Sequence, residues 1–140
     1  MDGPALIVDA GAIYAQFDAR DSHHEACLEL LHGHDGPLIV PTLVVTEVAH
    51  FLGRRLGWQA EVDLLGDLAE GVLILEPVHA ADPLRIAELV AQYRDLPLGT
   101  VDASVIAAAE RLGITQVATT DRRHFAVVRP SHVTAFELLP

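Results

Sequence analysis

Two residue types are missing from this chain of 140 residues, lysine and asparagine. All nine basic residues are arginines, against 20 acidic residues, and the formal net charge is −11. Without lysine, a P-loop would lack the side chain that contacts the phosphates, and an enzyme could not form a lysine Schiff base. The acidic balance disfavours a broad phosphate-binding surface. It still allows a nucleic-acid enzyme in which metal ions neutralise the site.

Cysteine and long apolar runs are scarce too. Cys27 is the single cysteine, so no disulfide can form within the chain, which is typical of a reducing cytoplasm. The longest apolar run, Val105–Ala109, is far shorter than the roughly 20 residues of a membrane span. Apolar residues make up 51% of the chain and are spread along its length. We therefore expect one globular domain, residues 1–140, located in the cytoplasm and not in a membrane.

Short β-branched apolar segments alternate with helical patterns along the chain. The strand candidates are Ala5–Asp9, Leu38–Val40, Val72–Leu75, Gln116–Thr120 and Val133–Phe136. The helical patterns cover Gly11–Phe17, Ser22–His32, Thr42–Leu56, Gln59–Glu70, Pro83–Arg94 and Val101–Leu112. This alternation predicts an α/β fold with a mostly parallel sheet covered by helices on both faces.

Four carboxylates are predicted to meet at one edge of this sheet. Asp9 and Asp121 end strands, Glu47 follows a strand in the next helix, and Asp102 opens a helix that leads into a strand. Ligands of parallel sheets collect beyond the carboxyl ends of the strands, and all four positions belong to that edge. Four like charges in one cleft repel each other unless cations bind them. The pattern therefore predicts a metal site, and its oxygen ligands favour Mg²⁺ or Mn²⁺.

Most of these acids also have a purely structural interpretation. Asp9 could cap the helix that follows it, Asp102 could interact with a helix dipole, and Asp121 could form a turn. Glu47 is harder to explain in this way, because its neighbours one turn away are mostly apolar and include no arginine. Asp95, which precedes the helix of Asp102, is a candidate supporting residue.

Other catalytic chemistries lack their motifs. The eight histidines include no His-Glu-x-x-His pattern, and there are no paired cysteines, so a zinc site is disfavoured. No Gly-x-Ser-x-Gly sequence is present, which argues against a serine hydrolase of the α/β-hydrolase type. No Gly-x-Gly-x-x-Gly follows the first strand, so dinucleotide binding has no support.

With these motifs in order along nearly the whole chain, the sequence resembles the PIN-domain ribonucleases, and most closely the VapC toxins of bacterial VapBC toxin–antitoxin pairs. The matching stretches are Leu6–Ala12, Pro41–Val48, Asp95–Ile106 and Ala118–Phe125. The resemblance implies a three-layer α/β/α fold, Mg²⁺ or Mn²⁺ dependence, cleavage of RNA, a homodimer and inhibition by a cognate VapB-type antitoxin.

The resemblance also assigns residues. It puts Asp9, Glu47, Asp102 and Asp121 at the acidic metal-binding, catalytic positions of the family, and it matches Thr119 to the hydroxyl residue that accompanies the last acid. The pair Ala10-Gly11 departs from the family, because many relatives carry threonine or serine after the first aspartate.

A metal-activated water would hydrolyse RNA to 5′-phosphate and 3′-hydroxyl ends. Arg122 and Arg123 are candidates for binding the RNA backbone, with a solvated loop as the alternative. Transfer RNA and ribosomal RNA both remain open as substrates. One rival is a non-catalytic PIN-like module that binds RNA or protein, which the four intact acids weaken. Another is a metal-dependent phosphatase, which the lack of a second acid two residues after Asp9 weakens.

The helical patterns Thr42–Leu56 and Gln59–Glu70, with the turn between them, carry more large apolar side chains than one small core can cover. These residues are Val44, Phe51, Leu52, Leu56, Trp58, Leu64, Leu65 and Leu68. We expect a second copy of the chain or an antitoxin peptide to bury part of this surface.

Overall fold

The computed structural model describes residues 3–140; Met1 and Asp2, which belong to the expected domain, lie outside the described residues. The strands are β1 (Leu6–Val8), β2 (Leu38–Pro41), β3 (Ile74–Glu76), β4 (Gln116–Ala118) and β5 (Glu137–Leu139). The helices are α1 (Ala10–Phe17), α2 (His24–Gly33), α3 (Thr42–Arg55), α4 (Trp58–Ala69), α5 (Asp82–Gln92), α6 (Thr100–Leu112) and α7 (Arg122–Val127).

The five strands form one sheet in the order β3-β2-β1-β4-β5, and every neighbouring pair is parallel. The predicted α/β fold class is therefore confirmed. After β1, the chain adds β2 and β3 toward one edge of the sheet, and later β4 and β5 toward the opposite edge. The strand order thus reverses at β1, and in open parallel sheets the crevice at such a point, beyond the carboxyl ends, is where ligands bind.

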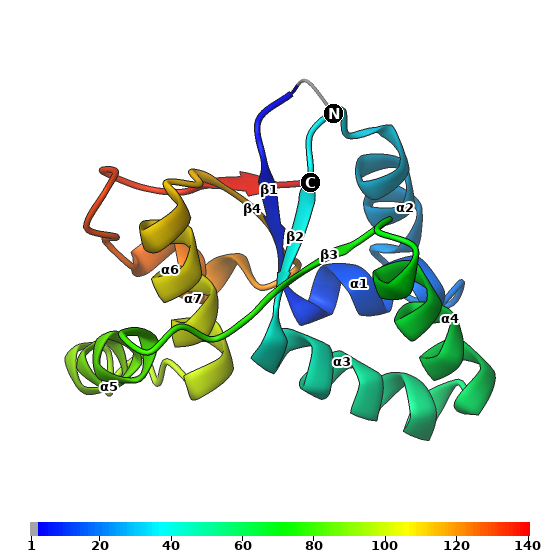
Figure 1. The fold of residues 1–140 in the computed structure, drawn as a ribbon, viewed down its shortest axis with the longest axis horizontal. Helices are drawn as coiled ribbons and strands as arrows, with labels where there is room; N and C mark the ends of the chain where they lie inside the picture. The colour runs from blue at the N-terminus through cyan, green and yellow to red at the C-terminus, as the bar shows by residue number, and fades with distance from the viewer. Residues whose placement is uncertain (1–2) are drawn as a thin grey trace.

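Helices cover both sides of the sheet (Figure 1). In this view α1, α2 and α4 lie to the right of β1, whereas α5, α6 and α7 lie to the left. The carboxyl ends of β1 and β2 point downward and continue into α1 and α3 at the lower edge. This edge is therefore where the chain turns from strand to helix.

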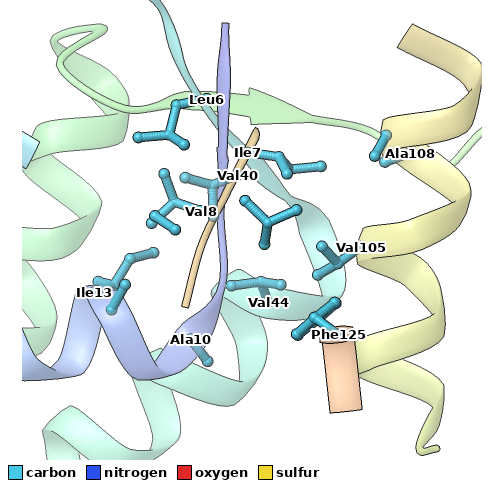
Figure 2. Close-up of a cluster of buried hydrophobic side chains, with 14 of the residues drawn as sticks. Leu6, Ile7, Val8, Ala10, Ile13, Val40, Val44, Val105, Ala108 and Phe125 are labelled. Carbon is cyan, nitrogen blue, oxygen red and sulfur yellow. The ribbon is translucent and has the colours of Figure 1, made fainter. Parts of the chain in front are cut away.

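The core is built around β1, because Leu6, Ile7 and Val8 are all completely buried. Burial of three consecutive side chains is what a central parallel strand with helices on both faces requires. Figure 2 shows that side chains from helices on both sides of the sheet reach this strand, among them Ile13 of α1 and Val105 of α6. Cys27 is also completely buried, and its thiol is free.

Two sequence-based expectations near the C-terminus are corrected. The segment Val133–Phe136 is not a strand; β5 begins one residue later, at Glu137. The apolar pattern pointed to the wrong residues because Phe136 is buried in the core as part of a loop, whereas β5 is only partly buried at the sheet edge. The helix α7 was not expected at all, because its six residues are too few for a recognisable apolar period.

The surface of α4 is more apolar than the core requires. Leu64 is completely buried, but Trp58, Val62 and Leu65 on the same helix are 71%, 49% and 48% exposed. The last three are spaced four and three residues apart, so they lie on one face of the helix. Among residues 3–140, no helix has both the length and the apolar character needed to span a lipid bilayer.

Arg111, in the last turn of α6, attaches this helix to two other elements. Its guanidinium donates to both carboxylate oxygens of Asp82 at 3.1 and 3.0 Å, and to Glu76 Oε2 at 2.6 Å. Burial would raise the pKa of Asp82, but the bonds from Arg111 and from the His79 amide hold it below its usual value. Because α6 also carries Asp102 in its first turn, this network helps to fix the position of that acid.

We predict that Arg111→Met lowers the free energy of unfolding by about 3 kcal/mol, because it leaves the buried Asp82 carboxylate without its charge partner. Chemical denaturation at neutral pH measures this loss. The matched control is Arg94→Gln, which removes an exposed arginine in the turn after α5 and should change stability by no more than about 0.5 kcal/mol. Equal stability of wild type and Arg111→Met would show that the network does not hold α6.

Candidate active site

The four predicted acids line one cleft at the carboxyl edge of the sheet. The cleft has a volume of about 420 Å³ and is lined by Asp9, Ala10, Gly11, Tyr14, Asp21, Glu47, Phe51, Arg55, Asp102, Thr120 and Asp121. Asp9 comes from the end of β1, Glu47 from α3, Asp102 from the first turn of α6, and Asp121 from the start of α7. The cleft therefore combines side chains from four segments that are far apart in the sequence.

The structural alternatives for these acids can be checked against the helix ends. Asp9 precedes α1, but its side chain makes no capping hydrogen bond. Asp102 lies in the first turn of α6, so its position fits the alternative of an acid that interacts with the helix dipole. Asp121 does cap α7, because its Oδ1 accepts a hydrogen bond of 3.4 Å from the His124 amide. Capping thus explains Asp121 in part and leaves the position of Asp9 unexplained.

Asp9 is the most perturbed of the acids. It is 5% exposed, and burial raises the pKa of its carboxyl group to about 7, with the charges of Asp102 and Glu47 acting in the same direction. The Ala10 amide and the Thr119 hydroxyl oppose this rise only in part. A buried carboxylate with acidic neighbours is stable in its charged form only when a cation balances it.

Two of the other acids are perturbed in the same sense. Burial raises the pKa of Glu47, and the charge of Asp102 adds to the effect. Burial also raises the pKa of Asp102, where His124 opposes the shift and Asp121 reinforces it. The carboxylates therefore affect each other's protonation across the cleft.

Thr119, the hydroxyl residue matched by the resemblance, connects two of the acids. It is 1% exposed. Its hydroxyl donates to Asp9 Oδ2 at 3.1 Å and accepts a hydrogen bond of 2.9 Å from the Asp121 amide. Because both of these bonds are buried or partly buried, they fix the Asp9 carboxylate relative to the start of α7.

His124 was not predicted as a site residue, yet it lies against two of the acids. Its Nδ1 is 2.7 Å from Asp121 Oδ2 and 3.3 Å from Asp102 Oδ2. Both ring nitrogens are buried, and neither has a well-directed hydrogen bond to another described residue. One ligand atom from each of Asp102, Asp121 and His124 lies within 4.8 Å of the others. The spacing of three residues between Asp121 and His124 would have indicated this contact, had α7 been predicted.

Ala10 and Gly11 stand where many relatives carry a hydroxyl residue after the first aspartate, and the structure shows what occupies the space beside Gly11. A Cβ atom at Gly11 would lie 2.3 Å from the Thr120 hydroxyl oxygen, far inside van der Waals contact. Thr120 lines the cleft, so its hydroxyl fills the space that a side chain at position 11 would need. The chain therefore presents a hydroxyl from the bend between β4 and α7 beside Gly11.

The other predicted site residues, Asp95, Arg122 and Arg123, do not line the cleft. Asp95 is exposed in the turn between α5 and α6, and it does not line the cleft. Arg122 and Arg123 are exposed at the start of α7, also outside the cleft lining. Arg122 donates to the backbone oxygens of Leu138 and Pro140. A role of either arginine in RNA binding stays a prediction. Arg55, which was not predicted, is the cleft-lining arginine among the described residues.

Comparison with known proteins identifies the family. The model of the PIN domain matches residues 6–129. The chain is 33% identical over 135 residues to Ribonuclease VapC26 of Mycobacterium tuberculosis, an alignment that covers 96% of this chain and 100% of that protein. The chain belongs to the PIN domain family, and it is of the VapC toxin type.

Solved structures share the fold of this PIN domain. The crystal structure of Mycobacterium tuberculosis VapC20, described as a sarcin-ricin loop cleaving toxin, has a TM-score of 0.79 at 22% identity and covers 84% of this chain and 90% of that one. The crystal structure of VapBC2 from Rickettsia felis, bound to a DNA fragment from its promoter, has a TM-score of 0.70 at 14% identity, covering 97% and 99%. At these identities the likeness concerns the fold.

The pKa of Asp9 leads to a prediction for the metal-free protein. Between the unfolded pKa of 3.8 and the folded pKa of about 7, the folded state binds a proton that the unfolded chain has released, so stability falls as pH rises. The difference corresponds to about 4 kcal/mol. Urea unfolding in EDTA should show about 2.7 kcal/mol of this loss between pH 5 and pH 8 in wild type, because about 1.4 kcal/mol is lost per pH unit between pH 5 and the folded pKa of about 7. Asp9→Asn should show a much smaller loss. Asp63→Asn, on the exposed surface of α4, is the control and should behave like wild type. A wild-type stability that rises between these pH values would contradict the assignment.

Proposed function

We propose that this PIN domain is an endoribonuclease that depends on Mg²⁺ or Mn²⁺ and acts as the toxin of a type II toxin–antitoxin pair. The observation that carries the proposal is the lining of a single cleft by the carboxylates of Asp9, Glu47, Asp102 and Asp121. The relative VapC26 is named a ribonuclease, which supports RNA as the substrate. We also propose that residues 1–140 fold as one domain and act in the cytoplasm.

The residues of the cleft fit a hard divalent cation. Carboxylate oxygens are the ligands that Mg²⁺ and Mn²⁺ prefer. Burial, together with the neighbouring acids, raises the pKa values of Asp9, Glu47 and Asp102, and a bound cation would favour their charged forms. The carboxylates of all four acids, Asp9, Glu47, Asp102 and Asp121, would hold the ion. When bound, the ion would supply a water of lowered pKa and an electrophile for a phosphate oxygen.

The side chains of the protein then have defined tasks. Thr119 orients the Asp9 carboxylate through its 3.1 Å hydrogen bond to Oδ2. His124 lies beside Asp102 and Asp121 and restricts where these carboxylates can point. Attack by water leaves a 5′-phosphate and a 3′-hydroxyl, because the ribose 2′-hydroxyl takes no part.

Solved structures with the same fold support the proposed partners, an antitoxin and an RNA substrate. The solved VapBC2 complex contains a toxin with its antitoxin, and this supports a VapB-type antitoxin as the inhibitor of our protein. VapC20 is described as cleaving the sarcin-ricin loop, so ribosomal RNA is one candidate substrate, and transfer RNA is another. The competing function is a non-catalytic module that binds RNA or protein through the same fold.

A second copy of the chain is the partner that we propose for α4. The exposed side chains of Trp58, Val62 and Leu65 lie on one face of this helix, where a symmetric contact would bury them against the same residues of the other copy. Removal of this apolar area from water would favour association.

Saturating Mg²⁺ should raise the melting temperature of wild type by about 5–10 °C, because the ion binds only the folded state. Asp102→Asn should reduce this rise and lower RNA cleavage by more than about 100-fold, since a metal ion contributes several kcal/mol to such a reaction. In EDTA the variant should be at least as stable as wild type, because one of the repelling charges is gone. Melting curves and gel assays of total RNA, with mapping of the new 5′ ends, measure these effects.

Asp63→Asn is again the control and should keep both the Mg²⁺ response and the activity. Cleavage that persists in EDTA or in Asp102→Asn would refute the metal-nuclease assignment. A protein with no Mg²⁺ response that still binds RNA would instead support the non-catalytic module.

Light scattering tests the association. We expect wild type to be a dimer and Leu65→Glu to shift the population toward monomer, because the substitution places a charge in the apolar contact. Leu84→Glu, on the exposed surface of α5, should leave the dimer intact. A wild type that is strictly monomeric and does not bind the product of an adjacent small gene would count against this surface.

A further inference from the structure

The acidic cleft continues along α3 beyond the four carboxylates. Glu47, Phe51 and Arg55 are spaced four residues apart and all line the cleft, so they lie on the same face of α3. The helix rises 1.5 Å per residue, which separates the Cα atoms of Glu47 and Arg55 by about 12 Å. Along α3 the lining of the cleft therefore changes from the carboxylate of Glu47 to the aromatic ring of Phe51 and then to the guanidinium of Arg55.

The guanidinium of Arg55 is held between two aromatic side chains. Its central carbon lies 5.3 Å from the centre of the Tyr14 ring and 4.8 Å from the centre of the Phe51 ring. The Tyr14 hydroxyl donates a hydrogen bond of 2.6 Å to Asp18 Oδ2, and this bond fixes the position of the Tyr14 ring. These cation–π contacts position the charge of Arg55 at the cleft.

Arg55 also has no ion-pair partner within residues 3–140, although five acidic side chains line the same cleft. In a chain with a net charge of −11, a nearby carboxylate would be the expected partner. Tyr14 and Phe51 hold the cation instead. An unpaired guanidinium at this position is suited to a phosphate that enters the cleft from outside.

Phe51 is not needed for the core. It is half-buried and is absent from the apolar side chains that pack on the core of the described residues. Its ring contacts Arg55 and, at 5.8 Å between centres, His50. A neighbouring cavity of about 320 Å³ is lined by His50, Phe51, Arg54 and Arg55. Phe51 and Arg55 thus line both cavities, and a second arginine, Arg54, lines the neighbouring one.

We propose that Tyr14, Phe51 and Arg55 form a subsite for an unpaired nucleotide of the RNA, next to the phosphate that is cut. Arg55 binds the phosphate of this nucleotide, the Phe51 ring stacks on its base, and Tyr14 holds Arg55 in place. The inference rests on the proposed nuclease function and specifies its substrate class as a single-stranded segment, such as a loop or an end.

The Phe51 ring is the reason why this subsite would prefer single-stranded RNA to a duplex. Bases in a duplex are already stacked on their neighbours, whereas an unpaired base can offer its face to an aromatic side chain. Stacking on a ring has little sequence preference, because every base has such a face. The subsite would therefore select unpaired RNA without selecting a particular base.

Binding is measured by fluorescence anisotropy with a short single-stranded RNA of mixed sequence and with the same RNA in a duplex. The protein carries Asp102→Asn in the presence of Mg²⁺, so that binding is observed without cleavage. In this background we compare Phe51→Leu, which keeps an apolar side chain, with Arg55→Gln, which removes the charge. Arg94→Gln, outside the cleft, is the control for the loss of one exposed arginine.

Phe51→Leu should weaken single-strand binding about tenfold, as expected for the loss of one stacked base. The dependence of log K on log salt should stay the same in this variant. Arg55→Gln should weaken binding and also reduce that slope by about 0.7, because one phosphate contact is lost. Arg94→Gln should change neither quantity, and wild-type affinity for the duplex should be lower than for the single strand. In the active protein, both cleft variants should raise KM and leave kcat within about threefold.

Unchanged single-strand affinity in both Phe51→Leu and Arg55→Gln would overturn the subsite, and so would equal binding of single strand and duplex by wild type. The nuclease proposal has a separate test, because it fails if wild type does not cleave RNA with Mg²⁺. The binding experiment gives its answer in either case.

Discussion

Repulsion between carboxylates at one edge of the sheet is the constraint around which this PIN domain is organised. Asp9 is almost completely buried, and Glu47 and Asp102 act on it across the cleft. Folding brings these charges together, and among the described residues no arginine forms an ion pair with any of the four acids. Such an arrangement lowers the stability of the protein when no cation is bound, and it is the basis of our proposal that the cleft binds a divalent ion.

The scaffold makes this arrangement possible by holding each acid on a different rigid element. The completely buried β1 fixes Asp9, and the Thr119 hydroxyl attaches its carboxylate to the start of α7. Helix α6 brings Asp102 in at one end, while Arg111 at the other end is bonded to Asp82 and Glu76. A charged cleft formed by loops alone could relax by moving its acids apart, whereas packed strands and helices cannot.

The sequence was sufficient for the parts that depend on regular patterns. The alternation of apolar strands and helices predicted the parallel sheet, and the rule for its carboxyl edge predicted that Asp9, Glu47, Asp102 and Asp121 line one cleft. It was not sufficient for short or long-range features. The six residues of α7 carry no clear period, so the contact of His124 with Asp102 was missed. The approach of Arg55 to Tyr14 depends on how α1 packs against α3, which no local pattern encodes.

The central claim is that the carboxylates bind a divalent ion together, and crystals grown with Mn²⁺ test it directly through anomalous scattering. We predict a manganese peak in the cleft within coordination distance of Asp9 and at least one of Asp102 and Asp121. The same peak should be absent from crystals of Asp102→Asn grown under matched conditions. Wild-type crystals that show no peak in the cleft at saturating Mn²⁺, or a peak bound only to other residues, would contradict the account.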